Sequence, residues 1–127
     1  MILCDTNIFI EVYKGNDDII NELKIIGTSN TALSDITIGE IYYGMRKREE
    51  AKTKELIKQF GRYPLTKDIS KKFIELISDP SVNKIGLPDC LIAATALVNS
   101  LEVYTLNVKH FQIIKGLKLY KPKAKKK

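Results

Sequence analysis

Three acidic residues stand where carboxylates could carry out chemistry together. Asp5 ends the apolar run "MILC", Glu40 lies in the first turn of the helix expected after "TALS", and Asp89 lies in the first turn of an alanine-rich helix. In a parallel α/β sheet the strand ends and the starts of the following helices share one edge, where such folds bind ligands. We therefore expect the three carboxylates to converge at that edge.

Carboxylates that converge repel one another and need a cation to stay ionised. The chain has one histidine and two cysteines, so the ligand set for zinc is missing and oxygen atoms would hold any metal. Mg²⁺ is the natural ion for such a site, and Mn²⁺ can substitute for it. A bound ion of this kind would polarise a phosphodiester and activate a water for attack. The spacing leaves open whether one or two ions bind.

Each acidic residue also has a purely structural interpretation. Asp5 could cap the following helix, "TIGE" matches a capping box with Thr37 as the cap and Glu40 reaching back to it, and Asp89 complements a helix dipole. These interpretations stay open for each residue taken singly. Capping gives no reason for all three to share an edge with Asn107, which ends "EVYTLN".

The elements that must position these residues alternate along the chain, which predicts an α/β fold with a mainly parallel central sheet. Proline is tolerated in an edge strand, so "RYPL" is expected at an edge. Strands are predicted at 2–5, 31–34, 62–65, 102–106 and 117–120. Helices are predicted at 6–15, 16–27, 35–61 with a break near 44–49, 67–79 and 88–101, and a loop at 80–88.

Length and composition predict one globular domain, spanning residues 1–120. Hydrophobic residues make up 44% and charged residues 28% of the 127 residues. No apolar stretch approaches the about 20 residues of a membrane span, and no secretion signal is present, so the cytoplasm is the expected location. Cys4 and Cys90 are interpreted as buried hydrophobic residues rather than a disulfide.

The net charge of +6 and the pI near 9.3 favour an anionic partner such as a phosphate backbone. Five of the lysines lie in 121–127, which is predicted to be a basic, disordered tail. Without them the net charge falls to +1. The basic composition is therefore a weak indication of nucleic-acid binding.

Four segments, "LCDTNIFI", "SDITIGEIYYG", "LPDCLIAATAL" and "VYTLNVKHF", occur in an order and spacing that resemble the PIN-domain ribonucleases, in particular the VapC toxins of type II toxin–antitoxin systems. The resemblance covers almost the whole chain. It implies a three-layer α/β/α sandwich in which Asp5, Glu40 and Asp89 hold Mg²⁺ or Mn²⁺ and activate water to cleave RNA. It also implies a homodimer and a cognate antitoxin that covers the acidic pocket.

Carried over position by position, the resemblance adds supporting residues. Thr6 and Asn7 match small polar residues that brace the first aspartate and a metal-bound water, and Thr105 joins them in support. Asn107 stands where many relatives have a fourth acidic residue and is counted with the catalytic residues. His110 stands where aspartate is frequent. These two departures reduce the negative charge, so we hypothesise weaker metal binding and a single ion.

Further candidates have competing interpretations. Arg46, Lys47 and Arg48 could bind RNA phosphates, although cations at a helix end also complement its dipole. Tyr42 and Tyr43 could stack on bases, although helical tyrosines more often pack in a core or a dimer interface.

Two other functions compete with the ribonuclease interpretation. A phosphate-accepting receiver domain shares the length and the α/β architecture, but it needs a paired acid at the first strand and an acceptor aspartate at a mid-chain strand end, and both are missing here. A non-cleaving module of the same fold would bind RNA or protein without using the carboxylates. Histidine at 110 could also act as a proton donor to the leaving oxygen.

Overall fold

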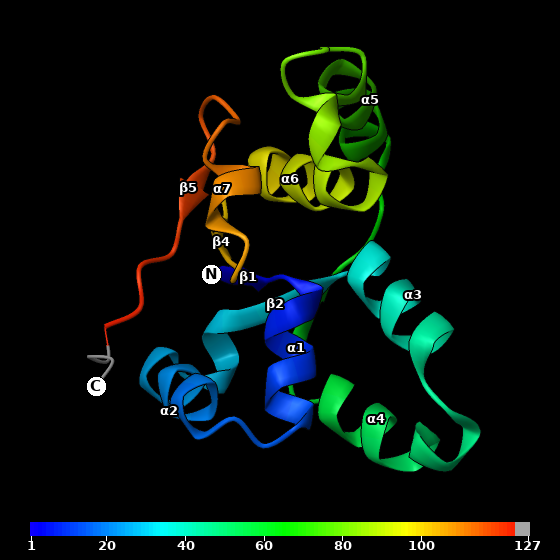
Figure 1. Cartoon of the computed structure of the whole chain (residues 1–127), viewed down its shortest axis with the longest axis vertical. Helices are drawn as coiled ribbons and strands as arrows, with labels where there is room; N and C mark the ends of the chain where they lie inside the picture. The colour runs from blue at the N-terminus through cyan, green and yellow to red at the C-terminus, as the bar shows by residue number, and fades with distance from the viewer. Residues whose placement is uncertain (124–127) are drawn as a thin grey trace.

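A central parallel sheet lies between two layers of helices (Figure 1). The computed structural model describes residues 1–123 of the chain. Its five strands are ordered β3-β2-β1-β4-β5, and every neighbouring pair is parallel. The strands are β1 Ile2–Cys4, β2 Thr31–Ser34, β3 Gly61–Tyr63, β4 Glu102–Tyr104 and β5 Lys118–Leu119. The predicted three-layer α/β/α sandwich is confirmed.

All the predicted helices are present, and the predicted break near 44–49 separates α3 from α4. The structure adds a short helix, α7, that the sequence analysis did not predict. The helices are α1 Thr6–Tyr13, α2 Asp17–Ile26, α3 Asp35–Gly44, α4 Glu50–Ile57, α5 Lys67–Ile77, α6 Leu87–Asn99 and α7 Val108–Phe111. Single 3₁₀ turns span Thr28–Asn30, Lys47–Glu49 and Asn83–Ile85.

The strand order excludes one competing function. Receiver domains have the doubly wound order 2-1-3-4-5, whereas this sheet has the order 3-2-1-4-5. The receiver-domain alternative is therefore wrong for this chain.

Side chains that alternate along the strands divide the core between the two faces of the sheet. Leu3 packs in the cluster beneath α5, α6 and α7, whereas Ile2 and Cys4 pack with Phe9 in the cluster beneath α1 to α4. Cys90 belongs to the first cluster, so the two free cysteines lie on opposite faces of the sheet and are both buried. Burial and the neighbouring Asp5 charge raise the pKa of Cys4 to about 12, which leaves it an inert core residue.

Helix α3 begins at Asp35, as predicted, but its N-cap is not the one that the sequence motif suggests. Ser34 is the N-cap, and its hydroxyl oxygen accepts a hydrogen bond from the Thr37 amide at 3.2 Å. The predicted capping box with Thr37 as the cap is wrong, because strand β2 ends at Ser34 and delivers an extended backbone and a hydroxyl to this position. Glu40 consequently lies in the second turn of α3 and is free of a capping role.

An ion pair attaches the edge strand to α3. The Arg62 guanidinium donates to both carboxylate oxygens of Asp35, at 2.6 and 3.1 Å, and the Leu65 amide donates to the same carboxylate. This pairing lowers the pKa of Asp35. The predicted edge strand is confirmed as β3, which ends before Pro64. Asp35 therefore has a structural role, although it is close in sequence to Glu40 of the candidate site.

The segment after β5 is fastened to α2 by a buried carboxylate. Glu22 is only 1% exposed, and it accepts hydrogen bonds from the Tyr120 hydroxyl and from the Lys123 amide, the latter at 2.9 Å. The Tyr120 ring also packs against Tyr104, with the ring centroids 5.1 Å apart. Residues 121–123 of the predicted tail are therefore attached to the domain, whereas 124–127 lie outside the described residues.

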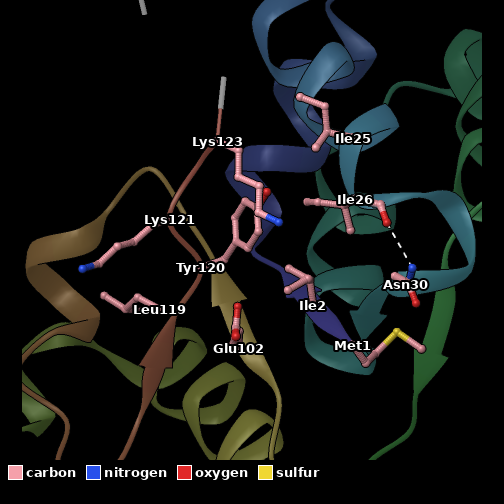
Figure 2. A pocket seen from close by; sticks show the side chains of 10 residues that line it. All are labelled: Met1, Ile2, Ile25, Ile26, Asn30, Glu102, Leu119, Tyr120, Lys121 and Lys123. Carbon is pink, nitrogen blue, oxygen red and sulfur yellow. Dashed lines mark hydrogen bonds between the residues drawn. The ribbon is translucent and has the colours of Figure 1, made fainter. Parts of the chain in front are cut away.

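This fastened segment borders a cavity of about 530 Å³ at the amino ends of the strands (Figure 2). Ile2 and Ile26 line one side, and Tyr120, Lys121 and Lys123 line the other. No helix within residues 1–123 is both long and apolar enough to cross a bilayer.

We predict that Tyr120→Phe destabilises the protein by about 1–2 kcal/mol, because buried Glu22 loses one of its hydrogen bonds while the aromatic packing is kept. Urea unfolding measures the difference. Tyr43→Phe is the matched control, because Tyr43 is 95% exposed and the same change there should stay within about 0.5 kcal/mol. Equal effects of the two substitutions would contradict the fastening role.

Candidate active site

The carboxyl ends of β1 and β4 form the crevice where this fold is built to bind ligands. The strand order reverses between these two neighbours, and ligands of open α/β sheets bind at such a switch point. Asp5 follows β1 directly, and Thr105 follows β4 directly. Helix α3 starts at this edge because it follows β2 directly, and α6 packs against α3. They bring Glu40 and Asp89 to the same side of the sheet.

Asp5 is held by two hydrogen bonds while it is almost removed from water. Asp5 is only 3% exposed. One carboxylate oxygen, Oδ1, accepts from the Thr6 amide at 2.7 Å, and the other, Oδ2, accepts from the Thr105 hydroxyl at 2.7 Å. Asp5 also occupies the N-cap position of α1. The capping and functional interpretations therefore coexist at this residue.

The pKa of Asp5 reports the charges around it. Burial, together with the nearby negative charges of Asp89 and Glu40, raises this pKa to about 6. The hydrogen bonds from Thr105 and Thr6 act in the opposite direction. Asp89 and Glu40 are thus each close enough to Asp5 for their negative charges to act on it.

Glu40 is oriented by a short chain of hydroxyl groups. The Thr6 hydroxyl donates to Glu40 Oε1 at 2.7 Å and lies 3.2 Å from the hydroxyl of Thr37. Thr37 is fully buried and receives a hydrogen bond from the Ser34 hydroxyl at 3.2 Å. Ser34 and Thr37 therefore belong to the support of the site, and sequence reasoning missed them because it assigned Thr37 to a cap.

The carboxylate of Asp89 is in contact with a histidine side chain. Its Oδ2 lies 2.9 Å from Nδ1 of His110, which comes from α7. The Asp89 side chain is 17% exposed and that of His110 is 51% exposed. The sequence placed His110 near the site only by resemblance, and nothing in its spacing from Asp89 announces this contact.

The turn after β4 joins two more of the predicted residues to Asp5. The Thr105 hydroxyl donates to Asp5 and also accepts a hydrogen bond from the backbone N–H of Asn107 at 2.9 Å. The Asn7 side-chain oxygen accepts from the Leu106 amide at 3.3 Å. Asn107 stands at the N-cap of α7, and its side chain makes no capping hydrogen bond.

The three carboxylates of the acidic edge are not paired with lysine or arginine in the described part of the chain. Within residues 1–123, no Lys or Arg forms an ion pair with Asp5, Glu40 or Asp89. The described side chains also include no set of three or more His, Cys, Asp or Glu residues close enough together to enclose a metal ion. The carboxylates therefore share an electrostatic field and oxygen donors suited to a hard cation, but they do not form a closed cage.

The remaining candidates lie outside the acidic edge. Arg46, Lys47 and Arg48 are exposed on the segment after α3. Tyr42 and Tyr43 are exposed as well, so packing in the core of this domain is wrong for both. A mainly apolar pocket of about 320 Å³ lies between α1, α3 and α4 and has Glu40 in its lining.

Comparisons with known proteins agree with this geometry. Residues 2–115 match the family model described as "PIN domain". Ribonuclease VapC10 of Mycobacterium tuberculosis is 34% identical over 124 residues, which cover 93% of this chain and 91% of the relative.

Solved structures with the same fold include a toxin–antitoxin complex from Klebsiella pneumoniae. A chain of that complex has a TM-score of 0.79 and 31% identity, with 92% of this chain and 95% of that chain covered. VapBC2 from Rickettsia felis, bound to a DNA fragment from its promoter, contains a chain with a TM-score of 0.81 and 27% identity, over 94% of this chain and 98% of that one.

We predict that the stability of the metal-free protein falls as the pH rises from about 4 to about 6. In this range folded Asp5, with its pKa raised to about 6, binds a proton more tightly than the unfolded chain, where the pKa is about 3.9. Asp5→Asn removes this dependence. The variant should be more stable than the natural protein at pH 7.5, by on the order of 2 kcal/mol, and nearly equal to it at pH 4.

Urea unfolding in EDTA between pH 4 and pH 8 measures both effects. Asp17→Asn is the matched control, because Asp17 is exposed on α2 and undergoes the same chemical change away from the acidic edge. If the natural protein were more stable than Asp5→Asn at pH 7.5, burial would not raise the pKa of the Asp5 carboxylate.

Proposed function

Because this chain belongs to the PIN-domain family, we propose that it is a divalent-metal-dependent endoribonuclease and the toxin of a toxin–antitoxin pair. The observation that carries the proposal is the approach of the Asp89 and Glu40 carboxylates to buried Asp5 at the switch point of the sheet, with no lysine or arginine paired to them in the described part of the chain. The naming of one relative as a ribonuclease and of similar structures as toxin–antitoxin complexes supports it.

The donor set suits a hard divalent cation. Asp5, Glu40 and Asp89 offer carboxylate oxygens, which Mg²⁺ prefers, and Mn²⁺ can substitute for it. A cation would also lift the mutual repulsion that raises the pKa of Asp5. When bound, such an ion supplies Lewis-acid polarisation of the phosphodiester and a lowered pKa for the attacking water.

The residues of the chain fix the carboxylates before substrate arrives. Thr6 contributes twice, through its amide to Asp5 and through its hydroxyl to Glu40, so these two carboxylates are held by one residue. Thr105 holds the second oxygen of Asp5. Preorganised groups of this kind spare the reaction the cost of ordering them at the moment of bond cleavage.

Substrate contacts are assigned to residues around the acidic edge. The Asn107 side chain makes no capping hydrogen bond, and we assign its side-chain amide to hydrogen-bond the substrate or a water at the edge. Arg46, Lys47 and Arg48 are exposed and are assigned to RNA phosphates beyond the scissile one. These contacts position the RNA, and sequence recognition would require further contacts to bases.

The protein partners follow from the same family. We propose a cognate antitoxin that covers the acidic edge, and a homodimer of the toxin. The exposed rings of Tyr42 and Tyr43 suit a protein interface better than free solvent, since aromatic residues are enriched at interfaces.

We predict that the purified protein cuts RNA at discrete positions with Mg²⁺ and that EDTA abolishes the cuts. Asp5→Asn and Asp89→Asn should each lower the rate by at least about 100-fold, because each removes a negative oxygen donor from the site. Sequencing of the cut ends in a total RNA pool provides the measurement. Asp17→Asn, the exposed control on α2, should cut at the natural rate.

The stability predicted for Asp5→Asn makes this test clean, because a lost activity would not reflect a lost fold. Cuts that persist in Asp5→Asn or in EDTA would contradict the proposed catalytic site. RNA binding that is indifferent to Mg²⁺ and to Asp5→Asn, without any cuts, would instead support the non-cleaving module.

We also predict that calorimetric titration with Mn²⁺ finds a single site per chain. Asn107 and His110 stand where relatives often carry acidic residues, and each replacement removes one negative charge from the second ion's surroundings. Two tight sites would contradict this prediction. The Asp89→Asn variant should lose the single site.

A further inference from the structure

The contact between His110 and Asp89 is not explained by the packing of the fold. The two residues are separated by 21 positions, and their side chains meet at 2.9 Å between α7 and α6. His110 remains about half exposed, so this side chain is not placed there by core burial. Phe111, the next residue, is fully buried and anchors α7 instead.

The chemistry of the contact sets its direction. An ionised carboxylate only accepts hydrogen bonds, so Nδ1 of His110 carries the proton and donates it to Asp89 Oδ2. One oxygen of Asp89 is thereby fixed to the protein, which leaves Oδ1 available as a ligand. Carboxylates that bind metals are commonly held in this way by a second hydrogen-bonding partner.

The segment that carries His110 also holds Asp5. Thr105 at its start donates to Asp5, and the Asn107 amide donates to the Thr105 hydroxyl. His110 at its end holds Asp89. Six consecutive residues, 105–110, therefore contact two carboxylates that come from different elements, β1 and α6.

We propose that His110 is a positioning residue for Asp89, and that segment 105–110 sets the separation of Asp5 and Asp89 for a divalent cation. The inference rests on the proposed metal site. In place of a further acidic ligand, this chain uses a hydrogen-bond donor that orients an existing one. His110 acts through Asp89 and does not itself contact the cation.

The opposite role predicts an opposite result. If the imidazole withheld Asp89 from the site, its removal would release the carboxylate and tighten metal binding. If it orients Asp89, its removal lets the carboxylate rotate toward solvent and weakens binding. Metal affinity without RNA therefore distinguishes the two roles by sign.

The experiment titrates the purified full chain with Mn²⁺ by calorimetry, without RNA. His110→Ala should raise the Kd by about tenfold, within the range seen for partners of metal ligands. His110→Asn should stay within about threefold of the natural protein, since asparagine carries an N–H donor at the δ position. Gln112→Ala, an exposed neutral neighbour just after α7, should leave the Kd unchanged.

Thermal unfolding of each variant shows that the fold is kept, which is expected because His110 is exposed. Natural or tighter Mn²⁺ binding by His110→Ala would overturn the inference, and so would His110→Asn behaving like His110→Ala. If the natural protein binds Mn²⁺ and cuts RNA while His110→Ala binds equally well, this inference fails alone. If the natural protein binds no Mn²⁺, the proposed function fails with it.

Discussion

The carboxylate of Asp5 is buried at the end of the central strand, and the groups around it determine the free-energy cost of that burial. Amide and hydroxyl donors from Thr6 and Thr105 offset part of that cost. Asp89 and Glu40 add to it, because their negative charges act on the same group. A fold that only needed a helix cap would not place two further carboxylates within reach of a buried one.

The topology explains why the whole chain is needed to build this site. Strand β1 lies at the centre, and the first half of the chain extends the sheet to one side through β2 and β3 while the second half extends it to the other through β4 and β5. Glu40 and its hydroxyl support come from the first half. Asp89, Thr105 and His110 come from the second half. The site exists only where both halves meet on β1.

Much of the fold could be predicted because local patterns agree with the tertiary structure. Short apolar runs alternate with amphipathic segments, so the strands and the main helices were found, and the proline after β3 marked an edge strand. The sequence placed Asp5 and Asp89 at element boundaries for the same reason. The family resemblance supplied the layer arrangement, which the alternation alone indicates but does not specify.

The remaining features depend on distances between elements, which spacing along the chain does not encode. The sequence motif "TIGE" suggests Thr37 as the cap of α3. In the structure the N-cap is Ser34, whose side chain accepts a hydrogen bond from the Thr37 amide. Helix α7 is only four residues long and too short for a periodic pattern. The burial of Glu22 could not be predicted from the charged residues around it in α2, because its partners Tyr120 and Lys123 are brought to it only in the folded chain.

Two lysines of the segment after β5 lie away from the acidic edge. Lys121 and Lys123 line the cavity beside the start of β1, together with Ile2 and Glu102 (Figure 2). A polyanion held by these two lysines is therefore not brought to Asp5, which lies past the carboxyl end of β1. Attraction to the basic segment after β5 is thus separate from delivery of RNA to the acidic edge.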